Sequence, residues 1–106
     1  MHVVYNGWFW DQPNTGSGQY LRYLITHLRK VAPDLQITLV LPSGVSPADV
    51  PAGINTIQAG GSRSNLGKVW FEQRTFPKIA GQVGAHIAHV PYWGSPLSSP
   101  IPLVTS

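Results

Sequence analysis

Two closely spaced glycines precede a segment whose pattern predicts a helix. Gly16, Ser17 and Gly18 lie in the stretch "DQPNTGSGQYLRYL". Glycine lets a ligand approach the backbone closely, and a helix N-terminus attracts anions such as phosphates. We therefore interpret residues 16–18 as a contact for a diphosphate or a sugar. The alternative is a plain helix entry, in which the glycines only form the turn.

Four aromatic residues follow predicted strands, where a parallel sheet would place its ligand. They are Trp8, Trp10, Tyr92 and Trp93. Aromatic rings stack on the apolar faces of sugars, and Trp and Tyr also carry a polar group. His89, which directly precedes "VPYW" at a strand end, is the histidine that we expect in a site. We interpret these residues as sugar contacts, and the alternative is that the aromatic ones are core or lid residues.

The sequence argues against several other chemistries. Leu21 occupies the third glycine position of a dinucleotide fingerprint, and the second strand ends "LVLPS" without the acid that would bind a ribose. His86 and His89 have an odd spacing on a predicted strand, so they point to opposite faces and cannot bind one ion. Cysteine is absent, which excludes disulfides and thiolate ligands. We therefore expect no nicotinamide, flavin or other cofactor, and no metal.

Composition places the chain among globular domains. Of its 106 residues, 42% are hydrophobic and 10% are charged, and the net charge of +3 comes from scattered bases without a basic run. This pattern does not predict a nucleic-acid surface. No segment resembles a signal peptide or reaches the roughly 18 apolar residues of a membrane span. We expect a cytoplasmic protein, with peripheral attachment to a membrane left open.

Hydrophobic periodicity predicts alternating strands and helices. The clearest element is a helix up to Val31, capped by Thr15 or Ser17 and ended by Pro33. One of its faces carries apolar residues at helical spacing, namely Leu21, Leu24, Ile25, Leu28 and Val31. A second helix is predicted over residues 65–83, with a kink or break at Pro77. Strands are predicted over residues 2–5, 35–41, 54–57, 85–90 and 101–106.

Strands separated by helices need crossover connections, which favour a parallel sheet. We therefore predict one α/β, Rossmann-like domain over residues 1–106. Helices cover both faces of its parallel sheet, and the expected strand order is 3-2-1-4-5.

Four segments together resemble the N-terminal domain of a retaining glycosyltransferase of the GT-B class, of the family-4 type. They read "PNTGSGQYLRYLITHL", "VWFEQRTFP", "GAHIAHVPYW" and "PIPLVTS". The chain departs from the family pattern at His86, where an Asp is common, and at Phe71, which is inserted between Trp70 and Glu72. The loops over residues 43–64 match no motif of the family.

The resemblance implies a truncated, acceptor-side domain whose donor-binding C-terminal domain is absent. Gly16, Ser17 and Gly18 would then lie near the diphosphate of a nucleotide-sugar donor. A second group would contact the sugar or lipid-linked acceptor, namely Trp8, Trp10, His89, Tyr92 and Trp93. The isolated chain is expected to be inactive. Two alternatives stay open: a stand-alone sugar- or nucleotide-binding module, and a structural fragment without a ligand.

The last predicted strand would lie at an outer edge of the sheet. Unpaired N–H and C=O groups at such an edge invite pairing with another chain. Pro100 and Pro102 protect only its beginning, because proline cannot donate to a ladder. We therefore expect a homodimer through residues 101–106.

Overall fold

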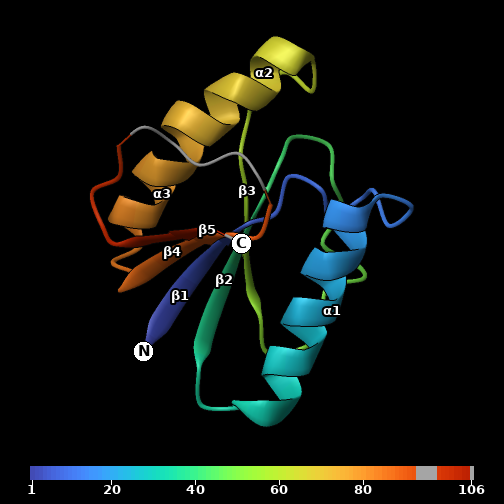
Figure 1. The fold of residues 1–106 in the computed structure, drawn as a ribbon, viewed down its shortest axis with the longest axis vertical. Helices are drawn as coiled ribbons and strands as arrows, with labels where there is room; N and C mark the ends of the chain where they lie inside the picture. Colours follow the sequence, from blue (N-terminus) through green and yellow to red (C-terminus); the bar gives the residue numbers. More distant parts are fainter. Residues whose placement is uncertain (93–97, 106) are drawn as a thin grey trace.

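The protein is an α/β domain, seen in a computed structural model that describes residues 1–92 and 98–105. Strand β1 (His2–Asn6) is followed by helix α1 (Gly16–Val31) and strands β2 (Gln36–Leu41) and β3 (Asn55–Gln58). A second helical segment comprises α2 (Asn65–Trp70), the π-helical turn η1 (Phe71–Thr75) and α3 (Phe76–Gln82). Strands β4 (Ile87–Val90) and β5 (Leu103–Thr105) complete the sheet (Figure 1).

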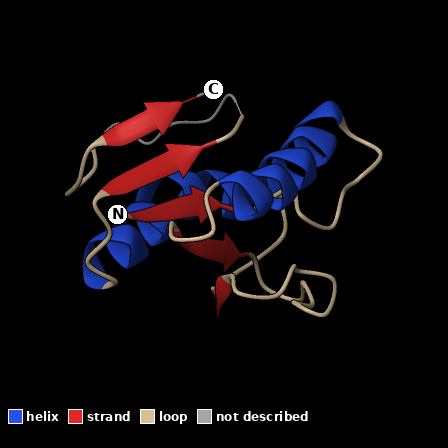
Figure 2. Ribbon diagram, turned by 90° about the horizontal axis from the view of Figure 1, so that it is seen from below, coloured by secondary structure: helices blue, strands red, loops and turns tan. Residues whose placement is uncertain are grey.

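The five strands form one parallel sheet in the order β3-β2-β1-β4-β5, as predicted. Strand β1 lies in the middle, where Val4 aligns with Thr38 of β2 and with Ala88 of β4. Figure 2 shows the twist of the sheet and the common direction of its strands. Because all neighbours are parallel, the carboxyl ends of the strands lie along one edge.

Helices cover both faces of the sheet, which confirms the predicted layers. On one face, Val4 and Val40 belong to a core cluster with Phe71 and Phe76 of the second helical segment. On the other face, Tyr5 and Leu39 belong to a cluster with residues of α1. Figure 1 shows α1 on one side of the sheet and α3 on the other. Alternating side chains of the central strands therefore enter two separate cores.

Helix α1 begins and ends as its sequence predicts. The Thr15 hydroxyl caps the helix by accepting a hydrogen bond from the Gly18 N–H, a group with no intrahelical partner. At the other end, Arg29 and Lys30 lie in the last turn, where the helix dipole favours cations. Leu21 and Ile25 are fully buried, so the predicted apolar face packs on the sheet over most of its length. The prediction for its last member, Val31, is wrong, because at the end of the helix Val31 is 62% exposed.

The second helical segment is irregular just before Pro77 rather than at it. The π-helical turn precedes α3, and the Phe76 N–H donates to the Phe71 carbonyl five residues back. Pro77 then takes a position in the first turn of α3, where the missing N–H of a proline costs nothing. The expected kink at Pro77 is thus replaced by a widened turn that holds Phe71 and Glu72 inward, since both are buried.

No helix in the described part of the chain is both long enough and apolar enough to span a bilayer.

Two histidines meet at the amino edge of the sheet. The Nε2 atom of His2 lies 2.7 Å from the Thr38 hydroxyl, and the His2 backbone N–H donates to Nδ1 of His86 at 2.9 Å. Burial lowers the pKa of His2, and the positive charges of His86 and the N-terminus lower it further. Burial also lowers the pKa of His89.

These shifts predict acid-sensitive stability. A lowered pKa means that the folded state binds protons more weakly than the unfolded state. The contribution of these histidines to the free energy of unfolding is therefore complete above about pH 6.5. It is lost as the pH falls through their pKa values in the folded state. We expect urea denaturation to give a decreasing free energy of unfolding from pH 7.5 to pH 5. His2→Gln should flatten this decrease. If the free energy of unfolding of His2→Gln falls with pH as steeply as that of the unmodified chain, His2 is not the source of the acid sensitivity.

The predicted self-association involves β5, which lies at one edge of the sheet with Val104 46% exposed. We expect sedimentation to detect a dimer at high micromolar concentration, and we expect Val104→Lys to shift it toward monomer, because lysine disfavours edge pairing. A strict monomer, or a dimer that Val104→Lys leaves intact, would refute this prediction.

Candidate functional site

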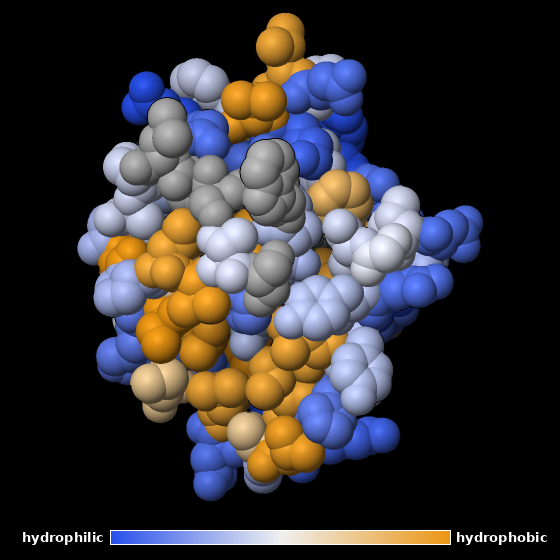
Figure 3. All heavy atoms as spheres, viewed as in Figure 1, coloured by the Kyte–Doolittle hydropathy of each residue, from blue (hydrophilic) through white to orange (hydrophobic). Residues whose placement is uncertain are grey.

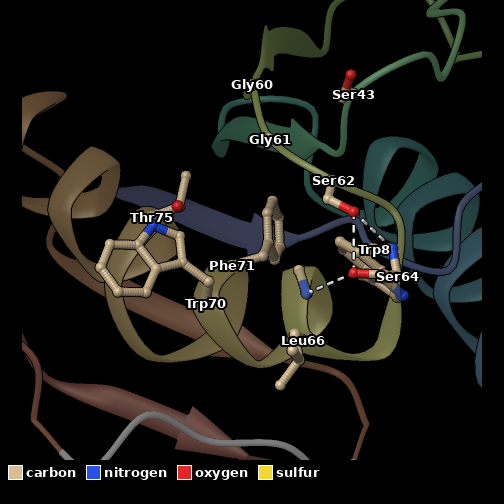
Figure 4. Close-up of a pocket in the computed structure, with 11 residues that line it drawn as sticks. Trp8, Ser43, Gly60, Gly61, Ser62, Ser64, Leu66, Trp70, Phe71 and Thr75 are labelled. Atoms are coloured by element: carbon tan, nitrogen blue, oxygen red, sulfur yellow. Dashed lines mark hydrogen bonds between the residues drawn. The ribbon is translucent and has the colours of Figure 1, made fainter.

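A cavity of about 420 Å³ lies at the carboxyl edge of the sheet. The loops that follow β1, β2 and β3 line it, together with α2 and η1 (Figure 4). Its lining residues are Trp8, Ser43, Gly60, Gly61, Ser62, Ser64, Leu66, Gly67, Trp70, Phe71 and Thr75. A hollow outside the carboxyl ends of parallel strands is the usual ligand position in this class of fold.

The cavity lining combines aromatic rings with hydroxyl groups. Trp8 and Phe71 are buried, and their ring centroids lie 5.2 Å apart in a tilted arrangement. Beside Trp8, the Ser62 hydroxyl donates to the Ser64 hydroxyl at 2.9 Å. Figure 4 shows Phe71 between Trp70 and Trp8, with the two serines beside Trp8. Such a lining can stack on an apolar ring face while it hydrogen-bonds to hydroxyl groups.

An ion pair joins two loops beside the cavity. Arg63, in the loop after β3, donates to both carboxylate oxygens of Asp11 at 3.1 and 3.2 Å. Its guanidinium also lies 4.7 Å from the centre of the Trp8 ring. The bidentate geometry fixes the relative position of the two loops. Arg63 therefore holds the Trp8 wall of the cavity in place.

A buried polar cluster lies beside the neighbouring strands β1 and β4, between η1 and the residues that follow these strands. Glu72 is buried and accepts a hydrogen bond from the Lys68 ammonium at 2.8 Å. This ammonium also lies 5.2 Å from the Tyr92 ring and 5.4 Å from the Phe9 ring. Burial raises the pKa of Tyr92, and the Glu72 carboxylate raises it further. Tyr92 is thus a neutral, buried phenol next to a compensated carboxylate.

Two polar atoms near this cluster have no hydrogen-bond partner within the described residues. They are Nδ2 of Asn6 and the hydroxyl of Tyr92. The side-chain Oδ1 atom of Asn6, in contrast, accepts from the Trp8 N–H at 2.9 Å and so fixes the start of the loop after β1. The Glu72 carboxylate and the Asn6 side chain nevertheless lie close enough to the Tyr92 hydroxyl to shift its pKa in opposite directions, so the three groups form one polar cluster.

The two glycines of the first loop, Gly16 and Gly18, have different surroundings. A Cβ at Gly18 would lie 1.9 Å from the Gln12 carbonyl oxygen, so the preceding loop itself occupies that space. A Cβ at Gly16 would meet nothing within 4 Å. The close approach that we expected of a ligand at Gly18 is therefore made by the chain itself, while Gly16 is open to solvent.

The structure brings only some of the predicted aromatic residues together. Trp8 lines the cavity. Tyr92 is buried in the same core cluster, and its ring meets Phe9 edge-on at 4.8 Å. Trp93 lies outside the described residues. Of the predicted aromatic sugar contacts, Trp8 therefore lies at the cavity, and Tyr92 lies in the core cluster that Trp8 also joins.

Trp10 and His89 lie on the opposite face of the sheet. Trp10 is 1% exposed; its indole N–H donates to Asp49 at 2.9 Å, and the Arg22 guanidinium lies 4.5 Å from its ring centre. The bonds from Trp10 and Arg22 lower the pKa of Asp49. His89 is half-buried, with its ring 5.0 Å from that of Tyr5. In this conformation Trp10 offers no ring face to a ligand.

Sequence reasoning missed the cavity residues of the loop after β3 and of α2. We interpreted "AGGSRSN" only as a loop, although it has the pattern that we used at residues 16–18: glycines and a serine between a strand and a helix cap. Ser64 does cap α2, accepting from the Gly67 N–H at 3.1 Å. The same pattern could therefore have indicated this segment.

No protein-family model, curated protein or solved structure matches this chain. The resemblance to glycosyltransferases therefore stays a prediction that rests on the quoted segments.

The two glycines of the first loop give a matched pair of variants. Gly18→Ala should lower the free energy of unfolding by about 2 kcal/mol, because the new methyl group overlaps the Gln12 carbonyl. Gly16→Ala should leave it unchanged or raise it by about 0.5 kcal/mol, because alanine is favoured within a helix. Denaturant titration of both variants measures the difference, and equal stabilities would show that the Gln12 carbonyl does not restrict residue 18.

Proposed function

We propose that this chain is the acceptor-side domain of a two-domain glycosyltransferase that moves a sugar from a nucleotide-sugar to an acceptor. The observation that carries the proposal is the cavity at the carboxyl edge, which joins aromatic rings to hydroxyl groups. It supports binding of a molecule with both ring faces and hydroxyls, as a sugar has. Two of the segments that resemble the GT-B class reach the same edge: one contains the start of α1, and the other contains Trp70 and Phe71 of the cavity lining.

In this proposal the acceptor binds in the cavity. Trp8 and Phe71 form its apolar wall, and Ser62 and Ser64 supply hydroxyls beside Trp8. A volume of about 420 Å³ lies within the range of about 300 to 1,000 Å³ typical of small-molecule pockets. Trp70 adds an exposed ring at the rim. These features favour one or two sugar rings over a large planar cofactor.

The donor diphosphate would bind at the start of α1. The N–H groups of Gly16 and Ser17 lie in the first turn of a 16-residue helix, whose positive end favours an anion. The Gly18 N–H is already bonded to Thr15, so Gly18 shapes the turn and does not itself contact the donor. Tyr92 would form a neutral polar wall behind the acceptor.

The domain alone would form one wall of the reaction site. A diphosphate bound on a single wall stays in water, where the charge of the leaving group is poorly stabilised. We therefore propose that transfer needs a second domain that carries further donor contacts.

A second candidate is a stand-alone sugar-binding module. It is favoured by one observation: the loops after β1, β2 and β3 converge with α2 and η1 to line one cavity. Such a module would bind a saccharide without affinity for nucleotide-sugars.

We expect the purified chain to bind simple saccharides weakly and to show no sugar transfer with a broad set of donors and acceptors. Trp70→Ala should weaken saccharide binding about fivefold, because an aromatic contact contributes about 1 kcal/mol. Tyr23→Ala is the matched control, since Tyr23 is exposed to a similar degree on α1. Calorimetric titration measures both variants.

The outcomes separate the candidates. Binding of nucleotide-sugars as well as saccharides supports the transferase domain, and binding of saccharides alone supports the module. Robust turnover by the purified chain would contradict the two-domain proposal. If the chain binds neither nucleotide-sugars nor saccharides, both candidate functions are contradicted.

A further inference from the structure

Helix α2 exposes three large apolar side chains to solvent. Leu66 is 83% exposed, Val69 54% and Trp70 64%. Their spacing of i, i+3 and i+4 places them on one side of the helix. Figure 3 shows apolar atoms at the top of the molecule, where α2 extends beyond the carboxyl edge of the sheet in Figure 1. An apolar group at such a projecting point is a typical interaction surface.

Two cations follow this apolar group along the same helical segment. Arg74 and Lys78 are exposed, and neither forms an ion pair with a described residue. Both line a hollow of about 340 Å³ that Trp70 also lines, and the Arg74 guanidinium lies 6.0 Å from the Trp70 ring centre. The cations and the apolar residues therefore border a continuous surface.

Negative charge is scarce in this helical segment. Between residues 63 and 83 the one acid is Glu72, which is buried and bonded to Lys68. Arg63 is already paired with Asp11. The charge offered to a partner by Arg74 and Lys78 is thus positive, and it lies beside exposed apolar side chains.

We propose that this surface, the α2 face formed by Leu66, Val69, Trp70, Arg74 and Lys78, docks on an anionic lipid bilayer. Apolar side chains with a neighbouring cationic group enter the boundary between headgroups and acyl chains, and tryptophan favours that depth. Arg74 and Lys78 would contact anionic headgroups. A second copy of the chain is the weaker partner, because its own α2 face would bring like charges together.

The docking is independent of the proposed function, since no sugar or nucleotide takes part in it. Leu66 and Trp70 belong both to the α2 face and to the cavity lining. Docking would therefore place the cavity mouth at the lipid surface. If the proposed function also holds, this position favours an acceptor that is attached to a lipid.

Vesicle flotation tests the proposal with the unmodified chain. We expect binding to vesicles of phosphatidylcholine containing phosphatidylglycerol, and at least tenfold weaker binding to phosphatidylcholine alone. Raising the salt concentration should weaken binding, because salt screens the headgroup charges. Absence of flotation with the anionic vesicles would overturn the proposal.

Surface variants locate the contact. Val69→Ser should weaken binding several-fold, and the double variant Arg74→Glu, Lys78→Glu should weaken it at least tenfold. The matched controls are Val31→Ser and Lys30→Glu on α1, where Val31 is 62% exposed. Circular dichroism and melting temperature establish that each variant is folded.

Two results would refute the α2 face as the lipid contact. One is an equal loss of vesicle binding in the α1 controls. The other is a vesicle-free dimer that Val69→Ser dissociates, since this face would then bind a second copy.

Discussion

The parallel pairing of β1 with strands on both sides is the constraint on which the other features depend. All five of its residues are buried, and it hydrogen-bonds to β2 on one side and to β4 on the other. Parallel pairing on both sides brings the carboxyl ends of these strands to one edge. The loops that line the cavity and the polar cluster of Glu72 and Tyr92 meet at that edge for this reason.

The loops that lead from this edge into α1 and α2 end in the same way, with a hydroxyl cap and a glycine three residues later. At α1 the cap is Thr15 and the third helical residue is Gly18; at α2 they are Ser64 and Gly67. A Cβ at Gly18 would lie 1.9 Å from the Gln12 carbonyl oxygen, and one at Gly67 would lie 2.0 Å from that of Ser62. Each glycine thus lets the preceding loop fold tightly against its helix. The glycines shape the walls of the site, which explains why a glycine pattern alone does not identify the atoms that touch a ligand.

Most of the fold could be predicted from the sequence, because it depends on periodicity. The apolar face of α1 follows from the helical spacing of residues such as Leu21 and Ile25. The buried strands follow from their short runs of apolar residues. Crossover connections indicate parallel pairing, and the doubly wound class of fold then supplies the strand order. The π-helical turn could not be predicted, because it depends on how Pro77 and the burial of Phe71 are accommodated together.

The candidate site was only partly predictable. A residue just after a strand can turn toward either face, and the contacts of the loop decide which. Trp8 turns toward Phe71, whereas Trp10 turns toward Arg22 and Asp49 on the other face. Backbone amide chemical shifts during titration with a saccharide and with a nucleotide-sugar test directly whether the carboxyl edge binds ligands. The account predicts shifts at Trp8, at residues 60–64 and at the Trp70 indole. Shifts confined to the amino edge around His2 and His86, or no shifts with either ligand, would contradict it.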